Sequence, residues 1–149
     1  MFDIRPATES DASQIGRFLD KFRSASSERR GARDFLDGSY LVAHPSEVGS
    51  SADFLVVLCL REGDLLGIGA LCFRDADAVV RGRLELFCSD DPDVATDVIQ
   101  RLLEAAEAEA RARGVREFDV FSLPGDQPLK SSLEERGYRA RLLILHRTL

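Results

Sequence analysis

Residues 83–114 constrain the fold more than any other stretch, because the hydrophobic periodicity changes within them. Up to Cys88, apolar residues recur at every second position, which is typical of a strand, and beyond it they recur at the spacing of an amphipathic helix. Asp91 suits the N-cap of that helix, Pro92 suits its first position, and Gly114 suits the position after its last turn. The stretch predicts a strand running into a long helix, and such a junction binds anions in many enzymes.

The size and charge of the chain restrict its class. Its 149 residues are 44% hydrophobic, which is enough for one domain with a core and too little for two of usual size, so we expect a single domain over residues 1–149. The formal charge of −6 argues against nucleic acid as a partner. No basic leader precedes an apolar segment, and no apolar run has membrane-spanning length, so we expect no membrane association.

The three cysteines, Cys59, Cys72 and Cys88, lie in apolar runs with a strand-like pattern. They are odd in number and lack the spacing of metal ligands, so we expect buried, reduced thiols, no metal site and a cytoplasmic protein.

Hydrophobic patterns and turn residues predict the remaining elements. Their order, strand, two helices, three strands, helix, strand, helix, strand, indicates an α/β (α+β) fold with a mixed sheet. The expected elements are a strand at 2–5, a helix capped by Ser10 or Asp11, a helix at 27–36, a short strand at 40–43, strands at 54–60, 65–73 and 78–88, the long helix, a strand at 117–121, a helix at 127–136, and one strand or a bent pair at 138–148.

One concentrated basic run, Arg29, Arg30 and Arg33, lies in the second expected helix. Charge runs of this kind usually form a solvated face, and we favour that interpretation over a contact with an anion.

The element order and three local stretches resemble the GNAT (GCN5-related N-acetyltransferase) superfamily, whose members transfer an acyl group from coenzyme A to an amine. IRPATESDASQI (4–15) is similar to the family's first strand and helix, GDLLGIGAL (63–71) to its central hairpin, and LEERGY (133–138) to the end of its last helix. The resemblance implies a GNAT-like fold, acetyl-CoA or another acyl-CoA as cofactor, and a small-molecule or peptide amine as acceptor. A homodimer through the last strands is common in such folds, and RLLILH (141–146) would supply an apolar edge for it, although a buried strand explains the same residues.

The family's signature Q/R-x-x-G-x-G/A follows the fourth strand, and its backbone amides wrap the pyrophosphate of coenzyme A. The matching positions here are Pro92, Ala95 and Asp97, and no glycine lies between Gly82 and Gly114, so the motif is degenerate. Acidic residues crowd the same place, and like charges disfavour a polyanion there. They are Asp90, Asp91, Asp93 and Asp97.

By resemblance, two backbone segments would hold the cofactor. The end of the fourth strand would contact the acyl and pantetheine part through strand-like hydrogen bonds, and the first turns of the long helix would face the phosphates. The residues are Leu86, Phe87 and Cys88 in the strand and Val94, Ala95, Thr96, Asp97 and Val98 in the helix.

The catalytic residue that we predict is Glu85, a mid-strand carboxylate able to accept a proton from an ammonium as a general base. The alternative is an exposed strand glutamate paired with Arg83 or another arginine. His44 and His146 are two further bases, but ordinary polar or core histidines are favoured for both.

The family's usual acid is absent from the last helix, because Leu133 stands where a tyrosine protonates the departing thiolate, and Asp126 stands where an asparagine is frequent. Ser131 and Ser132 are nearby hydroxyls, with helix-surface serines favoured. Cys88 as a nucleophile is less favoured than Cys88 as a buried small hydrophobe.

Two function classes remain open. The first is an N-acyltransferase that moves an acyl group directly from acyl-CoA to an amine without a metal. The second is a catalytically inactive GNAT-fold protein that acts as a binding, sensing or regulatory module.

Overall fold

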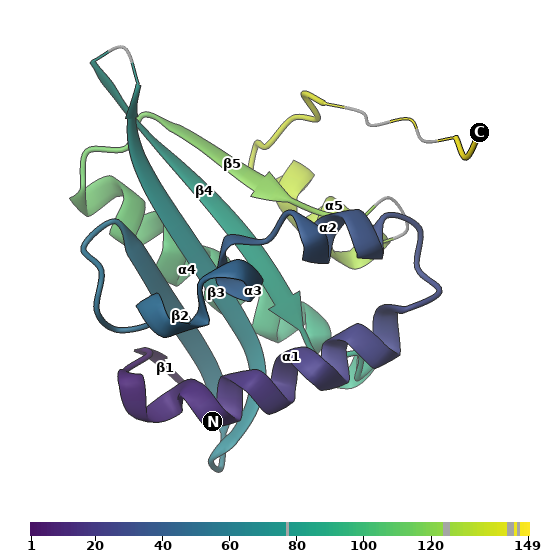
Figure 1. Cartoon of the computed structure of the whole chain (residues 1–149). Helices are drawn as coiled ribbons and strands as arrows, with labels where there is room; N and C mark the ends of the chain where they lie inside the picture. Colours follow the sequence, from purple (N-terminus) through teal and green to yellow (C-terminus); the bar gives the residue numbers. More distant parts are fainter. Residues whose placement is uncertain (77, 124–125, 143–144, 146) are drawn as a thin grey trace.

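A computed structural model describes residues 1–76, 78–123, 126–142, 145 and 147–149. It contains a five-stranded sheet in the order β1-β2-β3-β4-β5 (Figure 1). The first four strands pair antiparallel, and β4 pairs parallel with β5, which confirms the mixed sheet. The strands are β1 (Phe2–Pro6), β2 (Phe54–Arg61), β3 (Asp64–Ala76), β4 (Val79–Cys88) and β5 (Glu117–Phe121).

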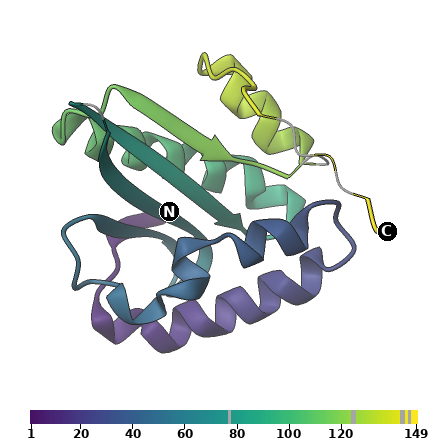
Figure 2. The ribbon, with the colours of Figure 1, turned by 45° about the horizontal axis from the view of Figure 1, so that its top comes forward.

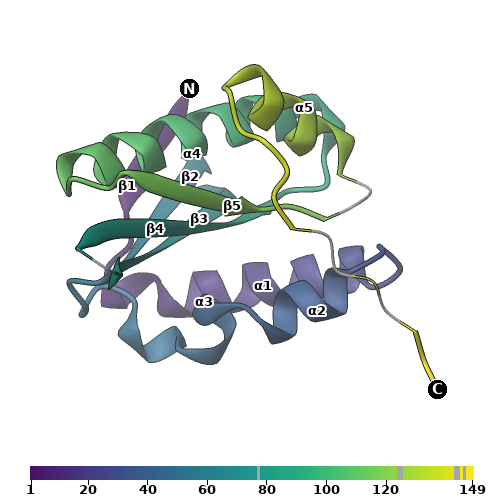
Figure 3. The same cartoon turned by 90° about the horizontal axis from the view of Figure 1, so that it is seen from above.

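Helices cover both faces of the sheet (Figure 3). On one face lie α1 (Ala12–Ser26), α2 (Ala32–Asp37) and α3 (Tyr40–Ala43), with short 3₁₀ turns at Glu9–Asp11 and Pro45–Glu47; on the other lie α4 (Pro92–Ala112) and α5 (Gln127–Glu135).

Two hydrophobic cores follow from this three-layer arrangement. Leu84 and Leu86 of β4 contribute to the core beneath α4, whereas Phe87 points to the core beneath α1 and α2. Because helices cover both faces of the sheet, a strand can carry apolar residues on both sides. Phe87 therefore breaks the alternation of polar and apolar residues but still belongs to a strand.

The predicted strand-to-helix junction is confirmed. Asp91 is the N-cap of α4, with its side chain accepting a hydrogen bond from the Asp93 amide, and Pro92 occupies the first helical position. Gly114 has a φ of 73°, the left-handed conformation that a residue after a helix end commonly adopts.

Two predictions in the region before β2 are wrong. The expected helix at 27–36 is shorter, because α1 continues to Ser26 and Gly31, with a φ of 78°, directly precedes α2. Residues 40–43 form the short helix α3 instead of a strand. Ser39 caps it, and the buried carboxylate of Glu85 accepts hydrogen bonds from its first amides, a tertiary contact that a local pattern does not contain.

The expected strand at 138–148 is also wrong for the residues that the structure describes, none of which lies in a strand; positions 143, 144 and 146 lie outside them. Arg136 and Tyr138 instead bind Glu107 of α4, so side chains anchor the start of this segment in place of a strand ladder. The homodimer through this segment stays a prediction. No helix in the described ranges is long and apolar enough to cross a membrane.

Candidate functional site

β4 and β5 part at their carboxyl ends. Their last paired residues are Glu85 and Phe121, and β4 continues to Cys88 with β3 as its only strand partner among the described residues. α1 and α2 flank these ends on one side, and α4 and α5 flank them on the other (Figure 2). Ligands of α/β sheets bind outside the carboxyl ends of parallel strands, so this opening is the candidate site.

A cavity of about 320 Å³ occupies the opening. Its wall is mostly apolar, and four charged residues lie around it, Arg29, Arg30, Asp90 and Asp126. The other lining residues are Phe22, Phe35, Leu86, Cys88, Ser89, Pro92, Ala95, Ile99, Phe121, Ser122, Leu123, Pro128 and Leu129. A volume of this size lies at the lower end of the range of small-molecule sites.

Two of the three predicted strand residues lie at the cavity, because the side chains of the strand alternate between the two faces of the sheet. Leu86 and Cys88 line the cavity, whereas Phe87 is fully buried in the other core. On the β5 side, residues 86–88 have no strand partner in the described part of the chain. Their backbone is therefore the part of the site best placed to bind an extended ligand by strand-like hydrogen bonds.

The backbone amides in the first turn of α4 already donate hydrogen bonds within the chain. The Asp93 amide donates to the Asp91 side chain, and the amides of Val94 and Ala95 both donate to the Asp91 carbonyl oxygen. Pro92 has no amide hydrogen. These contacts leave none of the first-turn donors to which a phosphate binds at other helix N-termini.

The five predicted helix residues occupy different environments. Ala95 lines the cavity, Val94 and Val98 are buried in the core, and Thr96 and Asp97 are exposed. From Thr96 onward the amides lie within the helix, where each bonds to the carbonyl four residues before it. Among the five, Ala95 alone reaches the cavity.

We expect Asp91→Ala to lower the free energy of unfolding by about 1 kcal/mol, because the Asp93 amide loses its acceptor at the N-terminus of α4. Chemical denaturation of both proteins measures the difference. Asp90→Ala is the matched control, because Asp90 lies outside the helix, and we expect its effect to stay within about 0.5 kcal/mol. Equal unfolding midpoints for Asp91→Ala and the parent would contradict the capping role.

Glu85 is buried, with 1% of its surface exposed, and it does not line the cavity. Its Oε2 accepts hydrogen bonds from the Ser39 hydroxyl at 2.6 Å and the Leu41 amide at 3.5 Å. Its Oε1 accepts from the Tyr40 amide at 2.7 Å and from Arg83 at 3.4 Å. The alternative of an exposed glutamate is wrong, although its arginine partner is present. The contacts tie α3 to β4, and the role of general base stays a prediction.

Of the two histidines, only His44 is among the described residues, and it lies away from the site. His44 is exposed, and its ring stacks on Tyr40 with 4.1 Å between ring centroids, away from the residues that line the cavity. His146 lies outside the described residues.

The remaining predicted residues lie beside the core, on the surface of α5 or at its N-cap. Burial raises the pKa of Cys88 to about 12, so its thiol is protonated at neutral pH and is a poor nucleophile. Leu133 and Ser132 are buried and Ser131 is exposed. Asp126 caps α5 by accepting a hydrogen bond from the Leu129 amide at 3.3 Å.

Comparisons with known proteins show the fold. No family model matches the chain, and no curated protein matches its sequence. Solved structures do match. A ribosomal-protein-alanine N-acetyltransferase from Brucella melitensis biovar Abortus 2308 is 10% identical over 100% of both chains, with a TM-score of 0.68. The aminoglycoside N-acetyltransferase AAC(6')-Iy in complex with CoA is 16% identical over 99% of this chain and 95% of that one, with a TM-score of 0.66. This chain has the GNAT fold. A transcriptional regulator from Bacillus halodurans C-125 shares the fold at 15% identity over 100% of both chains, with a TM-score of 0.72.

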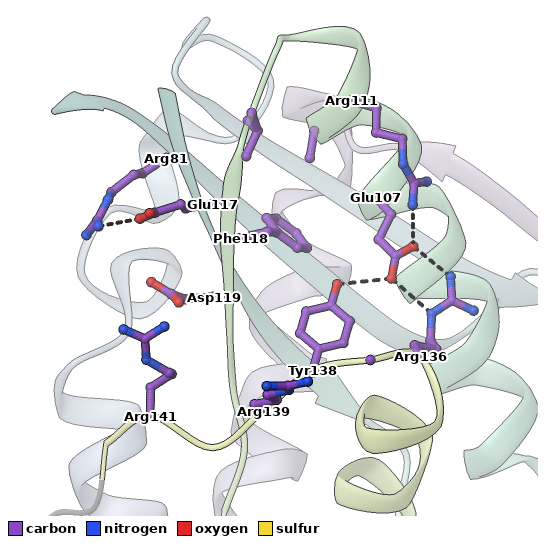
Figure 4. Close-up of a pocket in the computed structure, with 13 residues that line it drawn as sticks. Arg81, Glu107, Arg111, Glu117, Phe118, Asp119, Arg136, Tyr138, Arg139 and Arg141 are labelled. Carbon is purple, nitrogen blue, oxygen red and sulfur yellow. Dashed lines mark hydrogen bonds and ion pairs between the residues drawn. The ribbon is translucent and has the colours of Figure 1, made fainter. Parts of the chain in front are cut away.

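A larger cavity of about 640 Å³ lies at the opposite end of the β4–β5 pair in this GNAT fold. Figure 4 shows Arg111, Arg136 and Tyr138 pointing at the carboxylate of Glu107. The hydrogen bond from Arg136 lowers the pKa of Glu107, and burial raises that of Tyr138. Glu107 and its partners already satisfy one another, and their contacts fix the chain after α5 to α4. This larger cavity is therefore the weaker candidate for a ligand site.

The sequence pattern did not single out the residues that shape the smaller cavity. The basic run at Arg29 and Arg30 is the available signal. Both residues are exposed, as a solvated face predicts, and both also lie at the cavity. Phe35 and Phe121 had no signal beyond their apolar character, because the GNAT fold brings together elements far apart in sequence.

Proposed function

We propose that this protein is an N-acyltransferase that uses acetyl-CoA or another acyl-CoA to acylate an amine. The observation that carries the proposal is the end of β4, where residues 86–88 continue past β5 beside an apolar cavity. The GNAT fold supports it only by analogy with the acetyltransferases named above, because a fold alone does not determine an activity. The free cysteines among the described residues, Cys59, Cys72 and Cys88, favour a cytoplasmic protein.

Acyl-CoA supplies the activated acyl group, whose transfer forms a C–N bond to the amine and breaks the C–S bond, with the thiolate taking the proton that the amine loses. The backbone at Leu86 and Cys88 fits an extended pantetheine arm, because strand-like hydrogen bonds need an unpaired edge. Backbone N–H groups aimed at the acyl oxygen would also stabilise the negative charge that develops on it. Phe22 and Phe35 close the cavity opposite α4 and restrict access of water to this point.

The phosphates fit less well than the pantetheine arm. Asp91 holds the first amides of α4, and Asp93 and Asp97 place two exposed carboxylates on the first turns. Binding would therefore depend on the pantetheine and acyl parts of the cofactor, so we expect a weaker affinity than a glycine loop provides.

Isothermal titration with acetyl-CoA tests the proposal, and we expect saturable micromolar binding. Ala95→Trp should abolish it, because Ala95 lines the cavity next to the end of β4 and a large ring there fills the space for the thioester. Thr96→Trp is the matched control, since Thr96 is exposed on the same turn and is not part of the cavity wall. The absence of heat at millimolar acetyl-CoA, with the parent protein folded, would refute an acyl-CoA-dependent activity.

The satisfied first turn of α4 favours a second candidate, a catalytically inactive GNAT-fold module that binds or senses a ligand without coenzyme A. Such a module keeps the cavity and loses the cofactor. The titration discriminates the two functions, because the module predicts no acetyl-CoA binding in the parent or in either tryptophan variant.

A further inference from the structure

Opposite charges lie on two sides of the smaller cavity. Arg29 and Arg30 come from the segment between α1 and α2, on one face of the sheet. Asp90 and Asp126 precede α4 and α5, on the other face. In the described part of the chain, neither Arg29 nor Arg30 has an ion-pair partner. The cavity therefore presents cationic groups on one side and carboxylates on the other.

Between these charges the wall is apolar. Phe22 and Phe35 lie on the side of the arginines, and Leu86 and Phe121 lie at the ends of the two strands. Aromatic rings of this size bury a large apolar area and favour a ligand with an aromatic or branched aliphatic body. A ligand that covers this apolar surface removes it from water, which is favourable.

We propose that the acceptor is a small amino acid-like molecule with an apolar side chain, an anionic group that contacts Arg29 and Arg30, and an amine that faces Asp90 and Asp126. An arginine fork matches a carboxylate in geometry as well as in charge. This inference rests on the proposed function, and it names the class of acceptor.

The polarity of the cavity would also orient the acceptor. Asp90 and Asp126 lie on the side of α4 and α5, the side on which Cys88 and Ala95 line the cavity. An amine held there points toward the end of β4, where the thioester of the proposed acyl donor would lie. The anionic group points away from the negatively charged donor. Binding in the reverse direction would place like charges together.

Three ligands that differ by one group test the proposal with the protein alone. They are L-phenylalanine, phenethylamine, which lacks the carboxylate, and 3-phenylpropionate, which lacks the amine. We expect L-phenylalanine to bind at least about tenfold more tightly than either analogue, since each analogue loses one charge-assisted contact. Protein-detected NMR titration measures all three affinities.

Two variants locate the contacts. Replacing Arg29 and Arg30 together by glutamine should remove the preference for L-phenylalanine over phenethylamine. Arg33→Gln should keep it, because Arg33 pairs with Asp37 and does not line the cavity. The proposal is overturned if the analogues bind as tightly as L-phenylalanine, if no ligand binds at about 10 mM, or if Arg33→Gln has the same effect as the double variant.

The acetyl-CoA titration is carried out on the same preparation, so the two failures can be told apart. Acetyl-CoA binding without a preference for L-phenylalanine leaves the acyltransferase proposal standing and overturns the acceptor class. A preference for L-phenylalanine without acetyl-CoA binding supports an amino acid-binding cavity, but it overturns the acyltransferase and with it the role of the ligand as acceptor.

Discussion

Replacing Glu85 with glutamine should lower the free energy of unfolding by about 2–3 kcal/mol, although the two side chains have nearly the same shape. Both carboxylate oxygens of Glu85 accept hydrogen bonds, Oε2 from Ser39 and Oε1 from the Tyr40 amide. Either orientation of a glutamine amide sets its NH₂ group against one of these donors. A buried donor without an acceptor costs its full desolvation penalty.

Glu117→Gln is the matched control, because Glu117 lies on the adjacent strand β5 with its side chain 56% exposed and paired with Arg81. We expect its effect to stay below about 1 kcal/mol. Denaturant unfolding of both variants gives the comparison, and equal destabilisation by the two would contradict the role of Glu85 in holding α3.

The same variant tests the general base. If an acyltransferase activity is found, a base at position 85 predicts a lower kcat with a changed pH profile in the folded fraction of Glu85→Gln. A structural clamp predicts that the folded fraction keeps the parent's pH profile. If Glu85→Gln has the stability of the parent but a lower turnover, the result would favour the general base and contradict the structural role of Glu85.

The sequence predicted best those elements whose signals are local. The start of α4 combines a change of period with Asp91 and Pro92, all within a few residues, and the structure confirms it. The short gap between the expected strands at 54–60 and 65–73 is another case, because it holds a tight hairpin turn in which Glu62 and Gly63 have φ values of 53° and 85°.

Features that depend on distant partners were missed. α3 forms where a strand was expected, because Ser39 is hydrogen-bonded to Glu85, 46 residues away in sequence. The cavity likewise unites Arg29 with Asp126 across the two faces of the sheet. The apolar residues after Gly137 have a strand pattern, but a pattern does not supply a strand partner.

Gly67→Ala should destabilise the protein by about 3 kcal/mol, because β3 and α4 touch at this glycine. A Cβ atom at position 67 would lie 2.5 Å from Val98 Cγ1 and 2.9 Å from Leu102 Cδ1. Valine is stiff about χ1, so relief requires a shift of α4 or of the strand. The turn of α4 that would move carries Ile99, which lines the cavity, so ligand binding should weaken together with stability.

Gly69→Ala is the matched control on the same strand and the same face of the sheet. Its nearest neighbour would be Leu84 Cδ1 at 3.4 Å, an ordinary contact, so we expect a change within about 1 kcal/mol. The double variant Gly67→Ala, Val98→Ala removes the nearer of the two clashing atoms and leaves Leu102 Cδ1 in place. Unfolding measurements should then give a loss smaller than the sum of the two single losses, by about 1 kcal/mol or more. Strictly additive losses would mean that the approach of α4 to β3 is set elsewhere along the helix, and that the cavity wall does not depend on position 67.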